Sequence, residues 1–174
     1  DALGPDGDML AFWRLAVRFS LRGSGWIGKV ATQVDENLAD DVPHWIADAI
    51  DVANLIGPLA AASDVIGSVV GTDDRAERLA CFLADVVLAK SLCWDHPLPL
   101  TAIHLKKAML RDLRDGDAGS DIVVQSAITK GAQSAYQIAR TLAWRSEVLK
   151  AVAPKIRTRG AADAVALFLR EDAV

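Results

Sequence analysis

The chain contains few cysteines and no long apolar run. Cys81 and Cys93 are its two cysteines, and on one helix they would lie about 18 Å apart, which is too far for a disulfide. Two unpaired cysteines in apolar surroundings are typical of the reducing cytoplasm. Charged residues or glycines interrupt every apolar run well before about 18 residues, the length that a membrane-spanning helix needs. We therefore expect a cytoplasmic protein that does not enter a membrane.

The sequence also lacks the alternation of apolar and polar residues that is typical of β-strands, so no sheet is expected. Almost every segment instead repeats apolar residues at helical spacing. Hydrophobic residues make up 52% of the chain, which is enough for a sizeable core. We predict an all-α fold, a single-domain helical bundle of seven or eight helices over residues 1–174 with one long central helix. The first residues include neither an initiator Met nor a signal peptide, so we expect a fragment of a longer protein.

Glycine, proline and capping residues mark the ends of the predicted helices. Residues 22–28 form a glycine-rich break, Pro43 and Gly57-Pro58 begin new helices, and Gly71-Thr72-Asp73-Asp74 is a turn with a helix N-cap signal. The helix after this turn is expected to end near Trp94. The other predicted helices cover about residues 9–21, 29–40, 43–56, 58–70, 101–114, 121–152 and 160–171.

Apolar side chains at helical spacing predict which faces are buried. The stripes comprise Trp45, Ala49, Val52 and Ile56 in one helix, Leu79, Phe82, Leu83, Val86, Ala89 and Cys93 in another, and Ile128, Ala132, Ala135, Ala139 and Leu142 in the longest. The small side chains of the last stripe allow a close helix contact. Gly131, in the same helix, would cost about 1 kcal/mol relative to alanine unless a neighbouring helix packs against it.

The net charge of −4 is unevenly distributed along the chain. Residues 1–100 contain 7 Lys and Arg against 15 Asp and Glu, whereas residues 101–174 contain 12 against 8. An acidic first part and a basic second part indicate that any polyanion would bind the C-terminal part. Alternatively, these charged side chains only solvate the helix surfaces.

A basic joint connects the last two predicted helices. Pro154 removes a backbone donor and clashes with the preceding turn, so the long helix is expected to end near Val152. The candidate binding residues are the cations around this joint, Lys150, Lys155, Arg157 and Arg159. They could contact the phosphates of DNA. Alternatively, they neutralise the C-terminal end of the long helix and stack on Trp144.

Three segments carry a resemblance to a known family. Residues 94–100 read WDHPLPL, residues 151–161 read AVAPKIRTRGA, and the chain ends in EDAV. They resemble an alphaproteobacterial, often plasmid-borne family of unknown function with a W-x-x-P-x-P-L turn, an A-P-K-[LI]-R-x-[KR]-G-A joint and an [ED]-D-A-V ending. The resemblance covers about residues 75–174 and brings no catalytic residues. It implies a helical domain that is cut off before a winged-helix-like segment that could contact DNA.

The segment Gly23-Ser24-Gly25-Trp26-Ile27-Gly28 matches the pattern G-x-G-x-x-G. A dinucleotide site needs a strand before these glycines, whereas an amphipathic helix is predicted there. A phosphate-binding loop of the Walker type needs Ser or Thr after the lysine, and Val30 follows Lys29. We therefore interpret the segment as a turn between helices.

Two sets of polar residues could hold a metal or perform acid–base chemistry, namely Cys81, Cys93, His96 and His104, and the carboxylates Asp35, Glu36, Asp40, Asp41, Asp73, Asp74 and Glu77. A structural zinc site needs four close ligands, usually in two short pairs, and the first set is too widely spaced. The carboxylates fall at predicted helix ends, where capping and solvation are their ordinary roles. We therefore expect no metal, no cofactor and no enzyme activity.

Two functional hypotheses remain. In the first, the chain is the helical, non-catalytic core of a plasmid-associated regulator whose basic C-terminal part contacts DNA. In the second, it is a helical dimerisation or protein-docking domain, for example a homodimer, without nucleic-acid contact. Salt-dependent DNA binding would distinguish the two, because the slope grows with the number of phosphate contacts.

Overall fold

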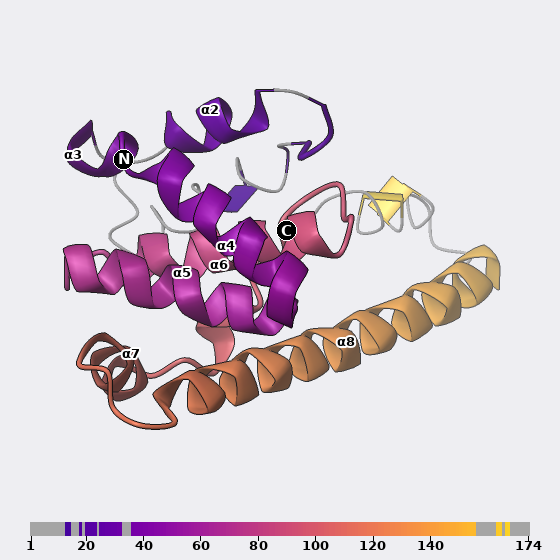
Figure 1. Ribbon diagram of the computed structural model, residues 1–174. Helices are drawn as coiled ribbons and strands as arrows, with labels where there is room; N and C mark the ends of the chain where they lie inside the picture. The colour runs from indigo at the N-terminus through magenta and orange to yellow at the C-terminus, as the bar shows by residue number, and fades with distance from the viewer. Residues whose placement is uncertain are drawn as a thin grey trace. The chain divides into compact units, whose positions relative to one another are not determined.

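The computed structural model describes residues 13, 14, 18, 20–23, 25–32, 36–155, 163, 164, 166 and 167. These residues form helices, turns and loops, and no strand occurs among them, which confirms the all-α prediction (Figure 1). Contacts divide the chain into two compact units, residues 1–132 and residues 133–174, which are described separately below. Nothing in the sequence indicates this division.

The described residues form seven α-helices and two short 3-10 helices. They are α2 (Trp26–Ala31), α3 (Glu36–Ala39), α4 (Val42–Ile56), α5 (Pro58–Thr72), α6 (Glu77–Ser91), η1 (Thr101–Ile103), α7 (Lys107–Arg114), α8 (Ser120–Val152) and η2 (Ala153–Lys155). Because α3 is a single turn, six helices have six residues or more, fewer than the seven or eight predicted. The helices predicted at 9–21 and 160–171 lie mostly outside the described residues.

The helix at the centre of the first unit is α6. All of its residues from Ala80 to Ala89 are buried, and both α5 and α4 pack against it (Figure 1). A helix that is apolar on every side is stable only when other helices surround it. The prediction that the long helix is the central one is therefore wrong for this unit. Cys93 is also not part of the predicted core stripe, because α6 ends at Ser91 and Cys93 is exposed with a φ of 56°.

A tight turn at Gly57 separates α4 from α5. Gly57 has a φ of 102°, which favours glycine, and Pro58 stands in the first turn of α5 as predicted. In α4 the buried side chains are Val42, Ile46 and Ala49. The predicted stripe is thus wrong at Ile56, which is 73% exposed. Ile56 continues the spacing of Val42, Ile46 and Ala49, but it is the last residue of α4, beside the turn at Gly57, and there it is exposed.

The helix predicted at 101–114 is interrupted. Residues 101–103 form η1, residues 104–106 are not helical, and α7 begins at Lys107. The cause is a contact with a distant residue, because the start of η1 is held by hydrogen bonds to Asp85 of α6. The following α7 packs on α5 instead, through Leu110 and Leu113. The apolar spacing within residues 101–114 does not reveal that η1 contacts α6 whereas α7 contacts α5.

Asp85 is a buried carboxylate that fixes the segment 94–101 to α6. Its Oδ1 accepts hydrogen bonds from the Leu100 N–H at 3.2 Å, the Thr101 N–H at 3.0 Å and the Thr101 hydroxyl at 2.6 Å. Burial raises the pKa of Asp85 to about 7, although these three hydrogen bonds act in the opposite direction. Asp85 is therefore a structural anchor for the turn of residues 94–100.

Gly131 of α8 lies against the same turn. A Cβ atom at this position would come within 2.2 Å of the Leu100 carbonyl oxygen, closer than any real contact. Gly131 therefore permits a close approach, and its neighbour is the backbone at Leu100 and not the helix that the sequence analysis considered. Together with Val124, Ala127 and Ile128, it anchors the first part of α8 within the first unit.

Candidate docking surface

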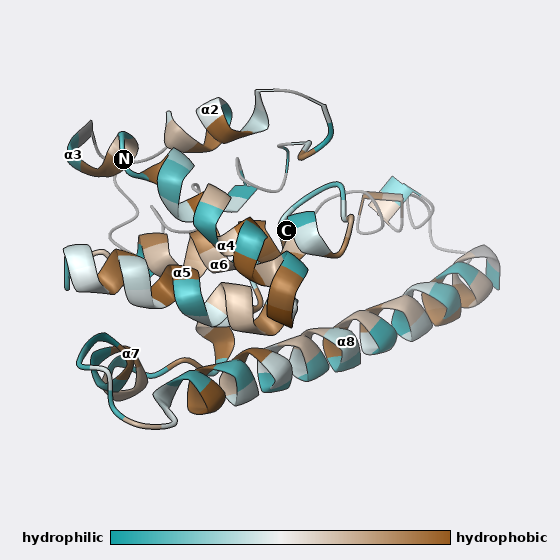
Figure 2. Ribbon diagram, in the orientation of Figure 1, coloured by the Kyte–Doolittle hydropathy of each residue, from teal (hydrophilic) through white to brown (hydrophobic). Residues whose placement is uncertain are grey.

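The second unit begins within α8, at Gln133. We call residues 133–152 of this helix the distal segment. Hydrophobic residues occur along the whole length of α8 (Figure 2). In the distal segment, however, the large apolar side chains are exposed: Tyr136, Ile138, Leu142, Trp144, Val148 and Val152. Exposed apolar residues in this number mark a surface that binds another molecule, because water contact with them is unfavourable.

One line of these residues continues the buried face of α8. In the first unit Val124, Ile128 and Gly131 are buried and are spaced by four and three residues. The same alternation continues through Ala135, Ile138, Leu142, Arg145, Leu149 and Val152, which we call the distal stripe. Spacing of this kind keeps side chains on one side of a helix and is typical of helix pairs. Ile138 is 60% and Leu142 59% exposed, so among the described residues these two side chains of the distal stripe are largely uncovered.

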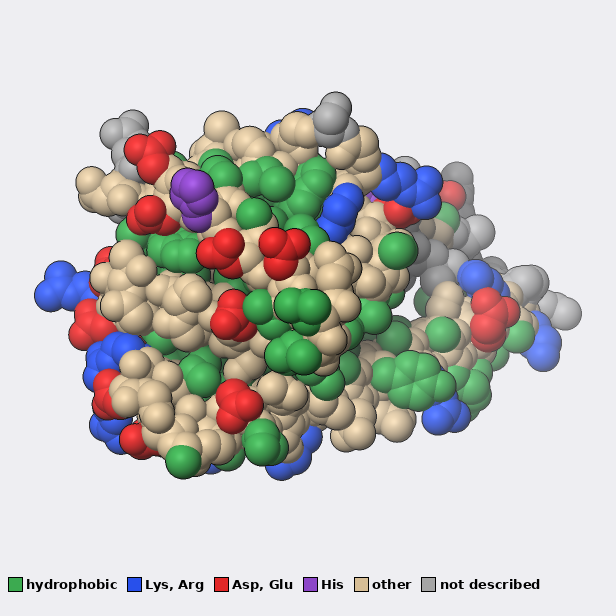
Figure 3. Space-filling model, viewed as in Figure 1, with side chains coloured by type: hydrophobic (Ala, Val, Ile, Leu, Met, Phe, Trp, Pro, Cys, Tyr) green, Lys and Arg blue, Asp and Glu red, His purple; other side chains and the backbone are tan. Residues whose placement is uncertain are grey.

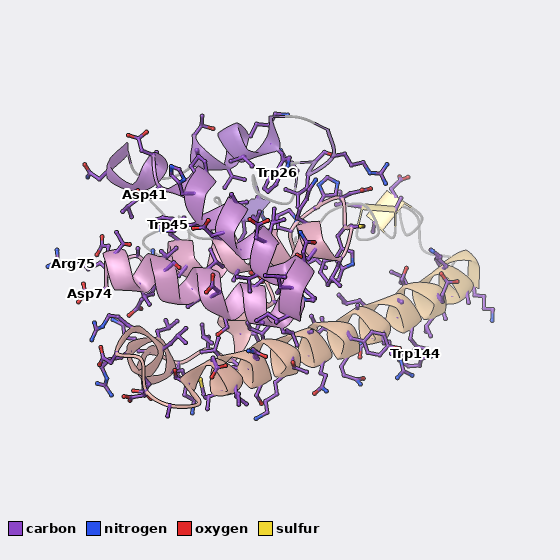
Figure 4. The ribbon with its side chains drawn as sticks, in the orientation of Figure 1. Trp26, Asp41, Trp45, Asp74, Arg75 and Trp144 are labelled. Atoms are coloured by element: carbon purple, nitrogen blue, oxygen red, sulfur yellow. The ribbon has the colours of Figure 1, made fainter. Side chains whose placement is uncertain are left out.

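Apolar side chains also occur on the opposite side of the distal segment. At 100° per residue, Tyr136 and Trp144 lie away from the distal stripe, and Trp144 projects from α8 with 66% of its surface exposed (Figure 4). A helix with apolar residues on both sides is normally covered by protein. The distal segment therefore has the character of a protein-binding helix more than of a helix that only contacts a polyanion.

The basic joint lies at the end of this segment. As predicted, α8 ends at Val152, and the turn that follows is η2. The Lys150 ammonium forms an exposed ion pair with Glu147 at 2.9 Å, and Lys155 is exposed in η2. Arg157 and Arg159 lie outside the described residues. The role of these four cations in nucleic-acid binding therefore stays a prediction.

In the described part of the segment, the Arg140 guanidinium lies 5.8 Å from the ring of Tyr136. The expected stacking of a guanidinium on Trp144 stays a prediction, because Arg157 and Arg159 lie outside the described residues. Arg140, Arg145, Lys150 and Lys155 give residues 133–155 four cations against a single acidic residue, Glu147. The distal segment thus combines an apolar stripe with a positive charge.

The glycine-rich motif is only in part the predicted turn, because its last three residues, Trp26 to Gly28, belong to α2. Gly23 and Gly25 both have positive φ angles, of 82° and 85°, and α2 begins at Trp26. The residues described before it, 20–22, are not in a strand. Because a strand is what positions a dinucleotide against such glycines, nothing in this arrangement favours a nucleotide site.

The cysteines and carboxylates that were considered as ligands do not converge. Burial raises the pKa of the Cys81 thiol to about 12, and Cys93 is exposed beyond the end of α6. No group of three or more metal-ligating side chains occurs in the part of the chain that the structure describes. That this protein needs no metal remains an expectation.

Two of the carboxylates form ion pairs between α6 and α7. Glu77 lies 3.4 Å from the Lys107 ammonium, and Asp74 lies 3.8 Å from the Arg114 guanidinium. Asp74 stands in the turn before α6, beside Arg75 (Figure 4). These partners are ordinary structural ones. Asp35 and the side chain of Glu36 lie outside the described residues.

Comparisons with known proteins show a family of unknown function, as the resemblance implies, but over more of the chain than about residues 75–174. The alphaproteobacterial, plasmid-borne origin stays a prediction. A family model with the description "Protein of unknown function (DUF1403)" matches residues 1–174. The chain belongs to this family. Neither the curated proteins nor the solved structures contain a significant match to it. Among the helices that the structure describes, none is both long enough and apolar enough to cross a bilayer.

Sequence reasoning found the basic joint but placed the buried face of α8 incorrectly. Ala132 and Ala139 of the predicted small-residue stripe are exposed, whereas Ile128, Ala135 and Leu142 of that stripe lie on the line of Val124 and Gly131. The face that is buried in the first unit points toward Ile128 and Gly131, and Ala132 and Ala139 lie to one side of it. The predicted stripe does not include Ile138, although Ile138 follows Gly131 by seven residues and so lies on the line of the buried face.

Proposed function

We propose that this chain is a non-catalytic helical docking domain that forms a homodimer through the distal stripe of α8. The observation that supports this proposal is the continuity of one apolar line, which is buried in the first unit and exposed in the second. The same residue spacing that packs against protein at Ile128 is available for packing at Ile138 and Leu142. A second copy of the chain offers the complementary surface.

The distal stripe is complementary to itself when two copies are antiparallel. With the midpoint between Ala143 and Trp144, Ala135 meets Val152 of the second copy. In the same register Ile138 meets Leu149, and Leu142 meets Arg145. Every member of the stripe thereby has a partner in the stripe, as a two-fold symmetric interface requires.

Charge favours the antiparallel arrangement over the parallel one. In a parallel pair, Arg145 of one copy would face Arg145 of the other inside the seam, and two like charges would repel. In the antiparallel pair each Arg145 lies beside Leu142 of the second copy, where its aliphatic stem packs and its guanidinium reaches water. The positions that flank the seam are uncharged, namely Ala139, Thr141, Ser146 and Val148.

Changes at Leu142 test both the dimer and its direction. Leu142→Arg places a second cation beside Arg145 of the other copy and is expected to weaken dimerisation by at least about 100-fold. Leu142→Glu instead places a carboxylate beside that Arg145, so its dimer is expected to be at least about tenfold tighter than that of Leu142→Arg. Sedimentation velocity over a range of protein concentrations measures both dissociation constants.

The matched controls are Gln137→Arg and Gln137→Glu, which make related charge changes at an exposed position off the distal stripe. Both are expected to dimerise like the unmodified chain. A chain that stays monomeric at all concentrations would refute the dimer. Equal effects of Arg and Glu at position 142 would refute the antiparallel direction.

A DNA-associated plasmid regulator, the role that the family resemblance implies, is the second candidate function. It is favoured by the excess of cations over residues 133–155. Combined replacement of Lys150, Lys155, Arg157 and Arg159 by Ala should then weaken DNA binding equally for all sequences. The salt dependence should fall by about one unit for each lost phosphate contact. Gel-shift titrations at two salt concentrations measure this, and absence of binding at low salt would eliminate the candidate.

A further inference from the structure

A groove lies on the first unit, away from the residues discussed as sites so far. Its apolar lining comes from Val52 and Ile56 of α4, Ala60 of α5 and Leu113 of α7, and its volume is about 550 Å³. The last turn of α4 beside it is strongly hydrophobic (Figure 2). Leu55, Ile56 and Leu59 are exposed there, so the apolar surface extends from the groove to its rim.

The charged residues that line this groove are all acidic. Asp64 of α5 and Asp121 of α8 belong to the lining, and no Lys or Arg does. Asp48 of α4 is close enough to raise the pKa of Asp64, in addition to the larger effect of burial. Figure 3 shows Asp and Glu side chains among hydrophobic ones over α4 and α5. We call this site the acidic groove.

These carboxylates have no cationic partner within the described residues. The ion pairs that occur there involve other residues, and neither Asp64 nor Asp121 is among them. The contrast with Asp74 and Glu77 is informative, because those carboxylates are paired with Arg114 and Lys107. A carboxylate that lies near another, as Asp64 does near Asp48, gains from a cation that arrives with a ligand.

A buried hydroxyl in the same groove also has no partner. Ser63 is 3% exposed and lines the groove, and its Oγ makes no hydrogen bond among the described residues. An unsatisfied buried polar atom costs about 1–3 kcal/mol. A ligand with a polar group at this point would remove that cost.

We propose that the acidic groove binds a cationic amphipathic helix from a partner protein. Apolar side chains of the helix would lie on Val52, Ala60 and Leu113, and its Lys or Arg side chains would reach Asp64 and Asp121. A hydrophobic groove is a common receptor for one face of a helix, and here the acidic residues in the lining favour a basic one. The partner is a different protein, because in the homodimer the helix of matching chemistry, the distal segment of α8, is already paired.

The probe for this site is a fluorescein-labelled peptide of about 18 residues, designed as a helix with Leu on one face and Lys and Arg beside it. A second peptide carries Glu at every Lys and Arg position. Fluorescence anisotropy of each peptide is measured while the full chain is added. We expect the cationic peptide to bind and the anionic one not to bind. Failure of the cationic peptide to bind would overturn the proposal.

Matched variants locate the binding. The double variant Asp64→Asn/Asp121→Asn should weaken binding of the cationic peptide about tenfold or more. The control is the double variant Asp40→Asn/Asp117→Asn, which makes the same charge change at exposed positions outside the lining. It should have almost no effect on binding. Equal losses in both double variants would show non-specific attraction to an acidic protein and would overturn the proposal.

The apolar part of the site is tested in the same way. Ile56→Gln should weaken binding, and Leu92→Gln, at an exposed position after α6, should not. Both residues are exposed in the free protein, so both variants should fold. A peptide with the sequence of residues 136–152 serves as the last arm. If it binds more tightly than the designed peptide, the groove belongs to a second copy of this chain and the proposal of a different partner is overturned.

Discussion

Gly131→Ala is expected to lower the free energy of unfolding by about 3 kcal/mol, a large effect for the addition of one methyl group. The new Cβ would lie 2.2 Å from the carbonyl oxygen and 3.2 Å from the carbonyl carbon of Leu100. A backbone atom cannot rotate away as the end of a flexible side chain can. Leu100 is also held from the other side, since its N–H donates to Asp85. Urea denaturation measures the change.

The control for this prediction is Gly71→Ala. Gly71 lies within α5, and a Cβ atom there would meet no other atom within 4 Å. Alanine has the higher helix propensity, so this variant should be more stable by about 0.5–1 kcal/mol. Equal stability of Gly131→Ala and the unmodified chain would show that α8 does not pack against the turn of residues 94–100.

Asp85→Ala is expected to cost about 2–4 kcal/mol at pH 5. Removal of the carboxylate leaves two buried N–H groups, those of Leu100 and Thr101, and the Thr101 hydroxyl without their acceptor. Asp85→Asn keeps an acceptor oxygen of the same shape and should be far less destabilising. Because Asp85 is protonated at pH 5, the comparison of the two variants isolates the contribution of the hydrogen bonds.

The same residue predicts a dependence of stability on pH. The pKa of Asp85 is raised to about 7 in the folded state, whereas an unfolded chain has an aspartate pKa of about 3.9. Between about pH 4 and pH 7 the folded protein therefore holds a proton on Asp85 that the unfolded chain releases. The contribution of Asp85 protonation to the free energy of unfolding is complete below about pH 4 and is lost as the pH rises to about 7. Asp85→Asn lacks this titration.

The expected observation is that Asp85→Asn gains stability relative to the unmodified chain as the pH rises from 4 to 8. At 1.36 kcal/mol per pKa unit, the gain has an upper limit of about 4 kcal/mol. Urea denaturation of both proteins at several pH values measures the difference, so that the other titrating groups cancel. Parallel curves for the two proteins would contradict the raised pKa.

The features that local sequence determines were predicted well. The predicted long helix, 121–152, differs by only one residue from α8. The agreement is close because local signals mark both ends: Gly119, with a φ of 80°, precedes the start of the helix, and Pro154 follows its end. The turn at Gly57-Pro58 was also predicted, since positive φ angles and a fixed proline φ act within a few residues. The glycine-rich break was predicted too long, because α2 begins at Trp26 within it.

Features that depend on distant residues were not predicted. The break between η1 and α7 arises from Asp85, more than ten residues earlier in the chain. The buried face of α8 depends on which residues of the first unit it meets, and Gly131 marks it through a contact with Leu100. Of the candidate site, the cations at Lys150 and Lys155 are visible in the sequence, whereas the distal stripe becomes apparent only once the exposure of Ile138 and Leu142 is known.

The antiparallel homodimer is tested most directly by distances between spin labels on the two copies. In a Cys93→Ser background, which leaves only the buried Cys81, single cysteines at the exposed positions Gln137, Ala143 and Ala151 carry the labels. In an antiparallel pair centred between Ala143 and Trp144, equivalent residues of the two copies move apart along the helix axis. Their separation grows by about 3 Å for each residue from the centre, which gives about 20 Å at Gln137. Pulsed dipolar spectroscopy should therefore give the shortest distance at Ala143 and longer ones at both Gln137 and Ala151. Equal distances at all three positions, or no dipolar coupling at any of them, would contradict the proposed dimer.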